Sequence, residues 1–181
     1  MKFYNTKTTL LAAVIGMTFV SSAMAADGTI TINGTITDTT CDIEVNNQSK
    51  NATVTLPTVS TSALASPGAT AGTTSFAIVL SNCAGATLNT ASTFFEAGAN
   101  VDMSSGRLNN SASATASNVQ VEILNAAQSK IMVGGDFNQG DIGVDITGGS
   151  GVMNYLARYY ANGVVTPGTV ATQVDYTIIY L

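Results

Sequence analysis

The apolar and polar positions of this chain alternate in short runs, as expected of β-strands. In the strictest run, residues 30–37, Ile30, Ile32 and Ile36 share one face, while threonines and Asn33 fill the other. Gly, Asn, Ser and Pro residues, which favour turns, separate it from further β-rich or apolar runs at residues 41–45, 52–56, 76–80, 93–97, 119–124, 130–133, 155–161 and 170–180. Many short strands separated by turn-forming residues predict an antiparallel β-sandwich. The polar or small-residue stretches are expected to be loops, at residues 60–72, 103–117 and 134–151.

Composition agrees with this all-β prediction. Only 9% of the 181 residues are charged, whereas Thr, Ser, Asn and Gly, all poor helix formers, are abundant. The chain has no histidine, which excludes Ser-His-Asp and Cys-His catalysis and removes the usual nitrogen ligand of transition metals. We therefore expect no enzymatic activity, no cofactor and no metal site.

The N-terminus has the features of a secretory signal peptide. Lys2 and Lys7 precede an apolar run over residues 10–20, and Ala23 and Ala25 provide the small residues of a cleavage site. A membrane-spanning helix needs about 18 or more apolar residues, which this run does not reach. We expect residues 1–25 to be a signal peptide that is removed on export. The remaining chain is strongly acidic, so nucleic acid is not an expected partner.

Export also bears on the two cysteines of the chain, Cys41 and Cys83. In an oxidising compartment, two isolated cysteines at this separation favour a structural disulfide, with a pair of free thiols as the alternative. A bridge that closes a loop of this length would stabilise the domain by about 3 to 4 kcal/mol.

Two local features stand out in the alternating runs. Gly34 lies in the middle of the apolar face of residues 30–37, where a glycine weakens an ordinary strand and usually marks the close approach of another backbone. Near the C-terminus, alternate residues form a second apolar face, made by Val174, Tyr176, Ile178 and Tyr180. We expect the first run to fit tightly against a partner surface and the second to be a strand of the sheet.

In combination, these features resemble the chaperone–usher pilins, the structural subunits of type 1-like fimbriae. The resemblance covers the whole chain after the expected signal peptide. Its motifs are the alternating extension with Gly34 seven residues before Cys41, the pair Cys41 and Cys83, residues 157–163 (ARYYANG), Thr166-Pro167-Gly168, and Gly168 as the fourteenth residue from the end with Tyr180 penultimate. The bulky terminal Leu181 departs from the family pattern.

For the fold, the resemblance implies an incomplete immunoglobulin-like antiparallel sandwich. Such a domain lacks its last strand and is completed by the donor strand of a neighbouring subunit. Residues 26–38 would be the donor-strand extension, and residues 39–181 would be the pilin domain. The donated residues that face the acceptor would be Ile30, Ile32, Gly34 and Ile36. The edge that a chaperone recognises and that borders the acceptor groove would include Gly168, Val174, Tyr176, Ile178 and Tyr180.

For function, the resemblance implies a structural subunit of a surface fimbria that polymerises head to tail by donor-strand exchange and supports adhesion. Its partners would be other copies of itself in a helical filament, a periplasmic pilus chaperone and an outer-membrane usher. The alternatives are a minor adaptor or tip pilin, and a secreted carbohydrate-binding β-sandwich.

Three other groups of residues suggest a catalytic, sugar-binding or metal-binding site, but we expect each of them to have a structural role. Glu96 and Glu122 could form a glycosidase pair, but each lies in a β-rich run without a cleft motif and is expected on a solvated sheet face. Arg158 lies among tyrosines, as in a sugar-binding cluster, and is expected to be a strand residue with aromatic neighbours. Residues 134–141 carry acidic and amide oxygens near glycines but lack the ligand spacing of an EF-hand, and are expected to be an exposed loop.

Overall fold

The computed structural model describes residues 29–85, 89–111 and 113–181. It separates the chain into an N-terminal unit that ends at Thr35 and a domain over Ile36–Leu181. The signal peptide expected over residues 1–25 lies outside the described residues. Among the described segments, no helix combines the length and the apolar character that a membrane span requires.

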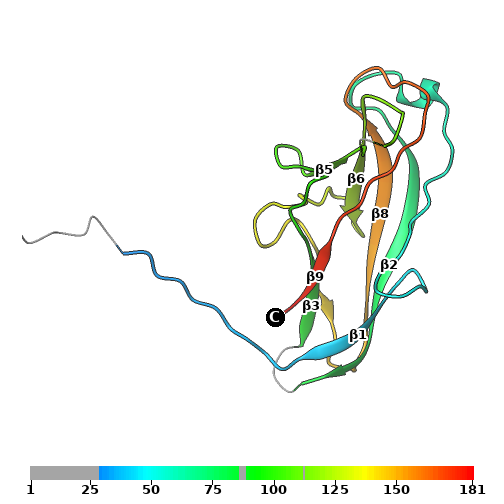
Figure 1. Cartoon of the computed structure of the whole chain (residues 1–181). Helices are drawn as coiled ribbons and strands as arrows, with labels where there is room; N and C mark the ends of the chain where they lie inside the picture. Colours follow the sequence, from blue (N-terminus) through cyan, green and yellow to red (C-terminus); the bar gives the residue numbers. More distant parts are fainter. Residues whose placement is uncertain (1–28, 86–88, 112) are drawn as a thin grey trace, which may run out of the picture. The chain divides into compact units, whose positions relative to one another are not determined.

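The domain is built from two antiparallel sheets, which confirms the predicted β-sandwich (Figure 1). The larger sheet has the strand order β1 (Thr40–Val45), β2 (Thr70–Ala84), β8 (Gly151–Ala161), β6 (Val119–Asn125), β5 (Arg107–Asn109) and β4 (Val101–Asp102). The smaller sheet has the order β7 (Val144–Asp145), β3 (Thr90–Phe95) and β9 (Tyr176–Tyr180). A short 3-10 helix, η1 (Thr61–Leu64), follows Ser60, whose hydroxyl accepts the N–H of Ser62.

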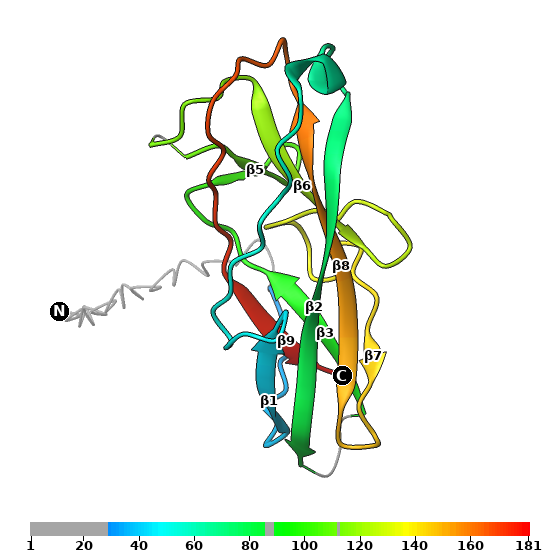
Figure 2. The same cartoon turned by 90° about the vertical axis from the view of Figure 1, so that its right-hand side faces the viewer.

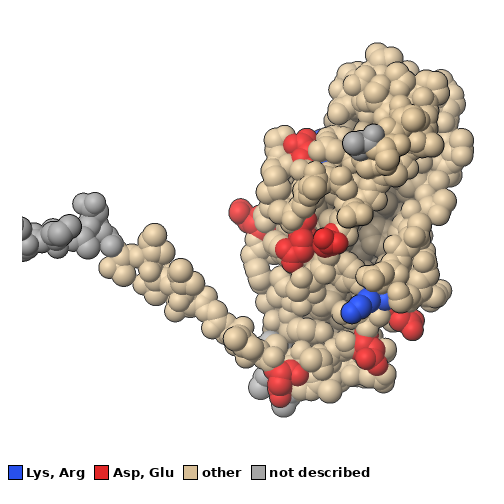
Figure 3. Space-filling model, in the orientation of Figure 1, with Lys and Arg blue, Asp and Glu red and all other residues tan. Residues whose placement is uncertain are grey.

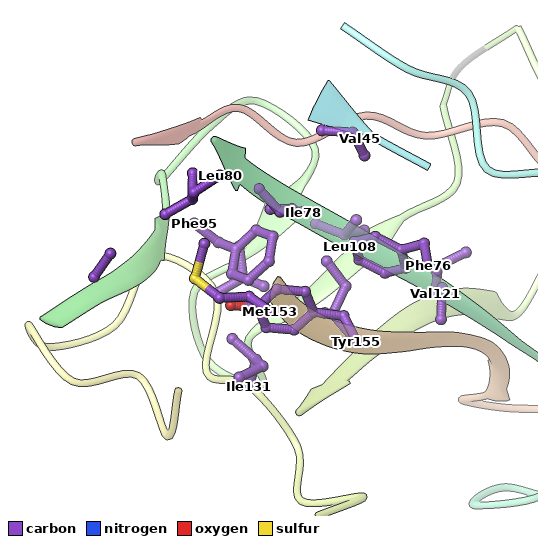
Figure 4. Close-up of a cluster of buried hydrophobic side chains, with 14 of the residues drawn as sticks. Val45, Phe76, Ile78, Leu80, Phe95, Leu108, Val121, Ile131, Met153 and Tyr155 are labelled. Carbon is purple, nitrogen blue, oxygen red and sulfur yellow. The ribbon is translucent and has the colours of Figure 1, made fainter. Parts of the chain in front are cut away.

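The core lies between the sheets, because every second residue of the long strands faces inward. In β2 the buried side chains are Phe76, Ile78 and Leu80, which alternate with more exposed neighbours. Figure 4 shows these side chains together with Tyr155 of β8 and Phe95 of β3. The rings of Tyr155 and Phe95 meet edge to face, with 5.3 Å between their centres. One hydrophobic cluster thus joins both sheets.

Two long connections leave the paired strands and run along the domain (Figure 1, Figure 2). After β1, Asn46 and Asn47 turn the chain with φ of 54° and 58°, a backbone region that asparagine tolerates. The chain then continues through residues 50–59 toward η1 without joining a sheet. After β8, residues 162–175 lead to β9, also without joining a sheet.

Most of the predicted strands are present. The runs that fall on or overlap β1, β2, β3, β6 and β8 are residues 41–45, 76–80, 93–97, 119–124 and 155–161. The predicted loops are partly wrong, since residues 60–72 contain the start of β2, residues 103–117 contain β5 and residues 134–151 contain β7. The strands β5 and β7 have only three and two residues and carry little local signal of their own.

Other runs with a strand pattern do not form strands. Residues 30–37 and 52–56 join no sheet, and residues 130–133 contribute a single bridge, from Lys130 to Leu124. In the run 170–180, only β9 is a strand. An alternating sequence becomes a strand only where a neighbour completes its backbone hydrogen bonds.

Candidate functional site

An apolar groove lies along the domain between two segments, the first wall (residues 50–56) and the second wall (residues 170–178). It has a volume of about 1000 Å³. Its floor is the core itself, formed by Ile43, Val45, Phe76, Ile78, Phe95, Leu108, Val121, Ile123, Ala157 and Tyr159. Of the described residues that line it, only Lys50 and Asp175 are charged, and Figure 3 shows mostly uncharged surface on this side of the domain. The groove therefore suits an extended apolar segment.

The first wall is held by its side chains and not by a backbone ladder. Val54 and Leu56 are half-buried and pack against the core. The side chain of Gln48 bonds both the N–H and the C=O of Thr53. No backbone–backbone hydrogen bond joins residues 51–59 to another residue in the described part of the chain. The first wall thus presents an unpaired strand edge.

The second wall includes β9, which is paired along one edge only. Its bonds to β3 include the N–H of Glu96 to the C=O of Asp175 at 2.8 Å, and a reciprocal pair between Thr90 and Leu181. In an antiparallel pair such bonds recur at every second residue, so the N–H and C=O groups of the intervening residues point away from β3. The intervening residues that also line the groove are Val174, Tyr176 and Ile178. The second wall therefore offers open backbone groups and apolar side chains on the same residues.

Thr172 adds a polar atom to the second wall. Its hydroxyl oxygen is buried and has no hydrogen-bond partner among the described residues. A buried polar group without a partner costs about 1 to 3 kcal/mol. Thr172 lines the groove, but this oxygen is shielded from solvent, so a segment lying in the groove would reach it only if the wall moved.

A side-chain hydrogen bond connects the two walls. The Tyr176 hydroxyl donates to the backbone carbonyl of Lys50 at 2.8 Å. Burial raises the pKa of the Tyr176 phenol above its ordinary value, so the hydroxyl stays protonated and remains a donor. This bond holds the walls together near the start of β9.

The residues predicted to form the donor strand carry exposed apolar side chains. The exposed fractions are 90% for Ile30, 89% for Ile32 and 101% for Ile36. A Cβ atom added to Gly34 would meet nothing within 4 Å. These alternating isoleucines are an apolar surface that the described residues do not cover.

The structure places the five residues predicted at the acceptor edge in different surroundings. Three of them, Val174, Tyr176 and Ile178, line the groove. Tyr180 packs against the same core and pairs with Ala91 of β3. Gly168 is not part of the groove lining, and a Cβ atom there would lie 2.6 Å from the carbonyl carbon of Thr115. Close packing of two loops therefore accounts for the glycine at position 168.

The expected disulfide is confirmed, and it joins Cys41 of β1 to Cys83 of β2 across a sequence separation of 42 residues. The two strands are neighbours in the larger sheet, with Ile43 opposite Leu80. The bridge thus ties β1, the strand that leads into the first wall, to the longest strand of the larger sheet.

The prediction of a solvated sheet face is wrong for Glu122. Its side chain is 4% exposed and lies between two arginines, with Arg107 Nε donating to Oε1 at 3.0 Å and Arg158 Nη2 donating to Oε2 at 2.6 Å. Arg158 is a residue of β8, as expected. Glu96 makes a separate hydrogen bond with a threonine of β9. The two glutamates therefore serve separate structural contacts. Within the described residues, no three potential metal ligands gather.

Residues 134–141 also differ from the predicted exposed loop. Gln139 is 5% exposed, and its side-chain amide bonds the backbone of Phe95 in β3. The Asp141 carboxylate accepts the N–H of Thr93, also in β3. Both residues are partners of the smaller sheet.

Sequence reasoning missed the first wall as part of the site. The alternation of Val54 and Leu56 reveals an apolar face, but it predicts an ordinary strand, because local sequence does not report whether the neighbouring backbone is paired. Lys50 and Thr172 belong to no recognisable motif, and only their position beside the groove identifies them.

Comparisons with known proteins identify the family of this chain. The chain matches the family model of type-1 fimbrial protein A over residues 56–181. It is 44% identical over 168 residues to the major fimbrial subunit SMF-1 of Stenotrophomonas maltophilia, which covers 88% of this chain and 95% of that protein. It is 40% identical over 179 residues to the F17 fimbrial protein of Escherichia coli, which covers 96% of this chain and 98% of that protein. In fold it is similar to the P pilus rod subunit PapA, with a TM-score of 0.60 and 18% identity over 77% of this chain and 99% of PapA.

Proposed function

Because the chain belongs to the type-1 fimbrial protein A family and is a structural subunit of a surface fimbria, we propose that its copies polymerise by donor-strand exchange. Residues 29–37 of one copy lie in the groove of the next, between the first and second walls. Ile30, Ile32 and Ile36 face the floor, and Gly34 lies where the floor leaves no room for a side chain. Such a head-to-tail contact does not close on itself and therefore grows a filament.

The observation that carries the proposal is the groove, whose walls present unpaired backbone on both sides of an apolar floor. A strand between them would pair with Val174, Tyr176 and Ile178 on one side and with residues 51–56 on the other. Full burial of the three isoleucines contributes about 5 to 9 kcal/mol. Each added hydrogen bond contributes about 0.5 to 1.5 kcal/mol more. One donated strand is therefore enough to hold a subunit firmly.

The same groove accounts for the proposed assembly partners. An uncovered apolar groove with open strand edges favours aggregation. A periplasmic chaperone would cover the groove after residues 1–25 have directed export, and an outer-membrane usher would exchange the chaperone for the next copy. The role is structural and involves no catalytic step, and adhesion is a property of the filament.

The experiment that tests the proposal compares two substitutions in the extension. Ile32→Asp places a charge on the face that enters the groove, whereas Thr31→Asp places the same charge on the opposite face. We expect Ile32→Asp to abolish fibres, because a carboxylate would be buried in an apolar groove. Thr31→Asp should leave fibre formation largely intact.

The readout is material sheared from cells and heated mildly in detergent. The wild type and Thr31→Asp should run as a ladder of multiples of the mature mass, and Ile32→Asp only as a monomer. Both variants should still copurify with the chaperone, which shows that the domain is folded. A normal ladder from Ile32→Asp would contradict donor-strand exchange.

A further inference from the structure

The smaller sheet has a second edge, on the side of β3 that faces away from β9. Because β3 bonds to β9 through Thr90 and Glu96, the alternating backbone groups of Ala91, Thr93 and Phe95 point to this second edge. β7 covers only its beginning, where Val144 lies opposite Ala91. Beyond β7, the groups of Thr93 and Phe95 need other partners.

Along the rest of this edge, one backbone bond runs from the N–H of Gly134 to the C=O of Phe95 at 3.1 Å, and two side chains take the remaining places of a partner strand. The Gln139 amide makes two bonds to Phe95, accepting its N–H at 2.9 Å and donating to its C=O at 2.8 Å. The Asp141 carboxylate accepts the N–H of Thr93 at 2.8 Å. A carboxamide has the donor and the acceptor of a peptide group, so Gln139 reproduces the reciprocal pair of an antiparallel ladder. We call Gln139 and Asp141 the edge plug.

The edge plug is itself fixed by the larger sheet. The Tyr155 hydroxyl of β8 donates to the two carboxylate oxygens of Asp141 at 2.9 and 3.0 Å. Burial raises the pKa of Tyr155 above its ordinary value, so this hydroxyl stays a donor. The Asn125 amide of β6 donates to the carbonyl of Gly140, between the two plug residues, at 2.8 Å. Rigid strands thus hold both side chains against β3.

We infer that Gln139 and Asp141 determine the specificity of strand addition by closing the second edge of the smaller sheet. With the plug in place, an incoming extension finds open backbone along β9 in the groove and occupied backbone along β3. Without it, the N–H groups of Thr93 and Phe95 would be free to donate to the carbonyl groups of a second strand, and filaments would branch. This inference rests on the proposed strand exchange and assigns the choice of edge to two named residues.

The test uses the full mature chain with Asn33→p-benzoylphenylalanine, a photo-reactive residue on the face of the extension that points out of the groove. Gln139→Ala/Asp141→Ala opens the second edge. Asp136→Ala/Asn138→Ala is the matched control, because it removes one carboxylate and one carboxamide from the same loop, where both side chains are exposed and make no hydrogen bond to β3. Cross-linked residues are located by fragmentation mass spectrometry.

In the wild type and the matched control, we expect cross-links at the two groove walls. The plug variant should show in addition new cross-links at residues 141–146, beside the second edge. Groove cross-links in all three chains without this gain would overturn the edge-plug inference alone. Absence of groove cross-links in the wild type would overturn donor-strand exchange and, with it, the inference.

A second measurement needs no substitution that might unfold the domain. In the wild-type chain, the amide hydrogens of Thr93 and Phe95 should exchange with solvent as slowly as those of Ser92 and Phe94, whose positions in β3 face β9. Fast exchange confined to Thr93 and Phe95 would show that the second edge is open and would overturn the inference.

Discussion

The two edges of the smaller sheet differ in what lies beside them and not in the strands themselves. Both present backbone groups of alternating β-branched or aromatic residues, on Val174, Tyr176 and Ile178 at one edge and on Thr93 and Phe95 at the other. Beside β9 lies a groove floored by the core, whereas beside β3 lie the two side chains of the edge plug.

Whether a strand edge is open or covered therefore depends on residues that are distant in the sequence. The plug residues are 44 and 48 positions away from the backbone groups that they bond. Under the proposed function, a subunit needs one edge that accepts a strand and another that refuses it. The fold meets both needs within a sheet of three strands.

The largest expected effect on polymerisation comes from a substitution that prevents a strand from entering the groove. Gly34→Ile would insert a side chain where the proposed register leaves no room, and overpacking a core costs about 1 to 3 kcal/mol or more. In an ordinary strand the same change would be neutral or favourable. We expect chaperone binding to persist and polymerisation to be nearly lost in a subunit–subunit exchange assay.

The matched control for this prediction is Thr35→Ile, which adds the same side chain to the opposite face of the extension. Its fibre yield should be close to that of the wild type. Normal yield from Gly34→Ile would show that the proposed register is wrong.

A change outside both edges should lower stability without altering the choice of edge. The double substitution Cys41→Ser/Cys83→Ser removes a bridge worth about 3 to 4 kcal/mol, so less subunit should copurify with the chaperone. The fraction that still assembles should cross-link only at the groove walls. Non-reducing peptide mapping of wild-type fibres should recover the intramolecular bridge, and a bridge between subunits would contradict its structural role.

A smaller loss of stability is expected from a substitution in β9, the strand that lies between the groove and β3. Tyr180→Ala removes a half-buried ring that packs against the core, which costs about 2 to 3 kcal/mol. More of the variant subunit than of the wild type should be degraded in the periplasm and less should be polymerised, as measured by immunoblot of periplasmic fractions. Tyr180→Phe keeps the ring and serves as the control. Unchanged chaperone copurification of Tyr180→Ala would count against this role of Tyr180.

The smallest effect concerns the bond that joins the groove walls. Tyr176→Phe keeps the ring but loses the hydrogen bond to Lys50, a change of about 0.5 to 1.5 kcal/mol. A synthetic peptide of residues 27–38 should therefore displace the chaperone a few-fold faster, since 1.4 kcal/mol corresponds to about tenfold. Tyr180→Phe should leave this rate unchanged. A rate equal to that of the wild type would show that the bond does not restrain the walls.

Local sequence predicts those parts of the site whose pattern reflects one buried face. The apolar face shared by Val174, Tyr176 and Ile178 follows from period-two alternation. The strands β2, β6 and β8 were predictable from β-rich or apolar runs between turn residues. The disulfide was predictable from export and cysteine count. The first wall was not predictable as an open edge, because its sequence alternates in the same way whether or not a neighbouring strand completes its backbone hydrogen bonds.

The sequence by itself determined the alternating apolar faces of the extension and of the C-terminal strand, and the cysteine pair, because these depend on residue type and spacing alone. Only the tertiary structure decided which edges are open. It turned residues 134–141 from a polar loop into the partner of β3, and it buried Glu122 between two arginines. The physical reason is that a backbone hydrogen bond or an ion pair needs a partner at a fixed distance, and that partner comes from elsewhere in the fold.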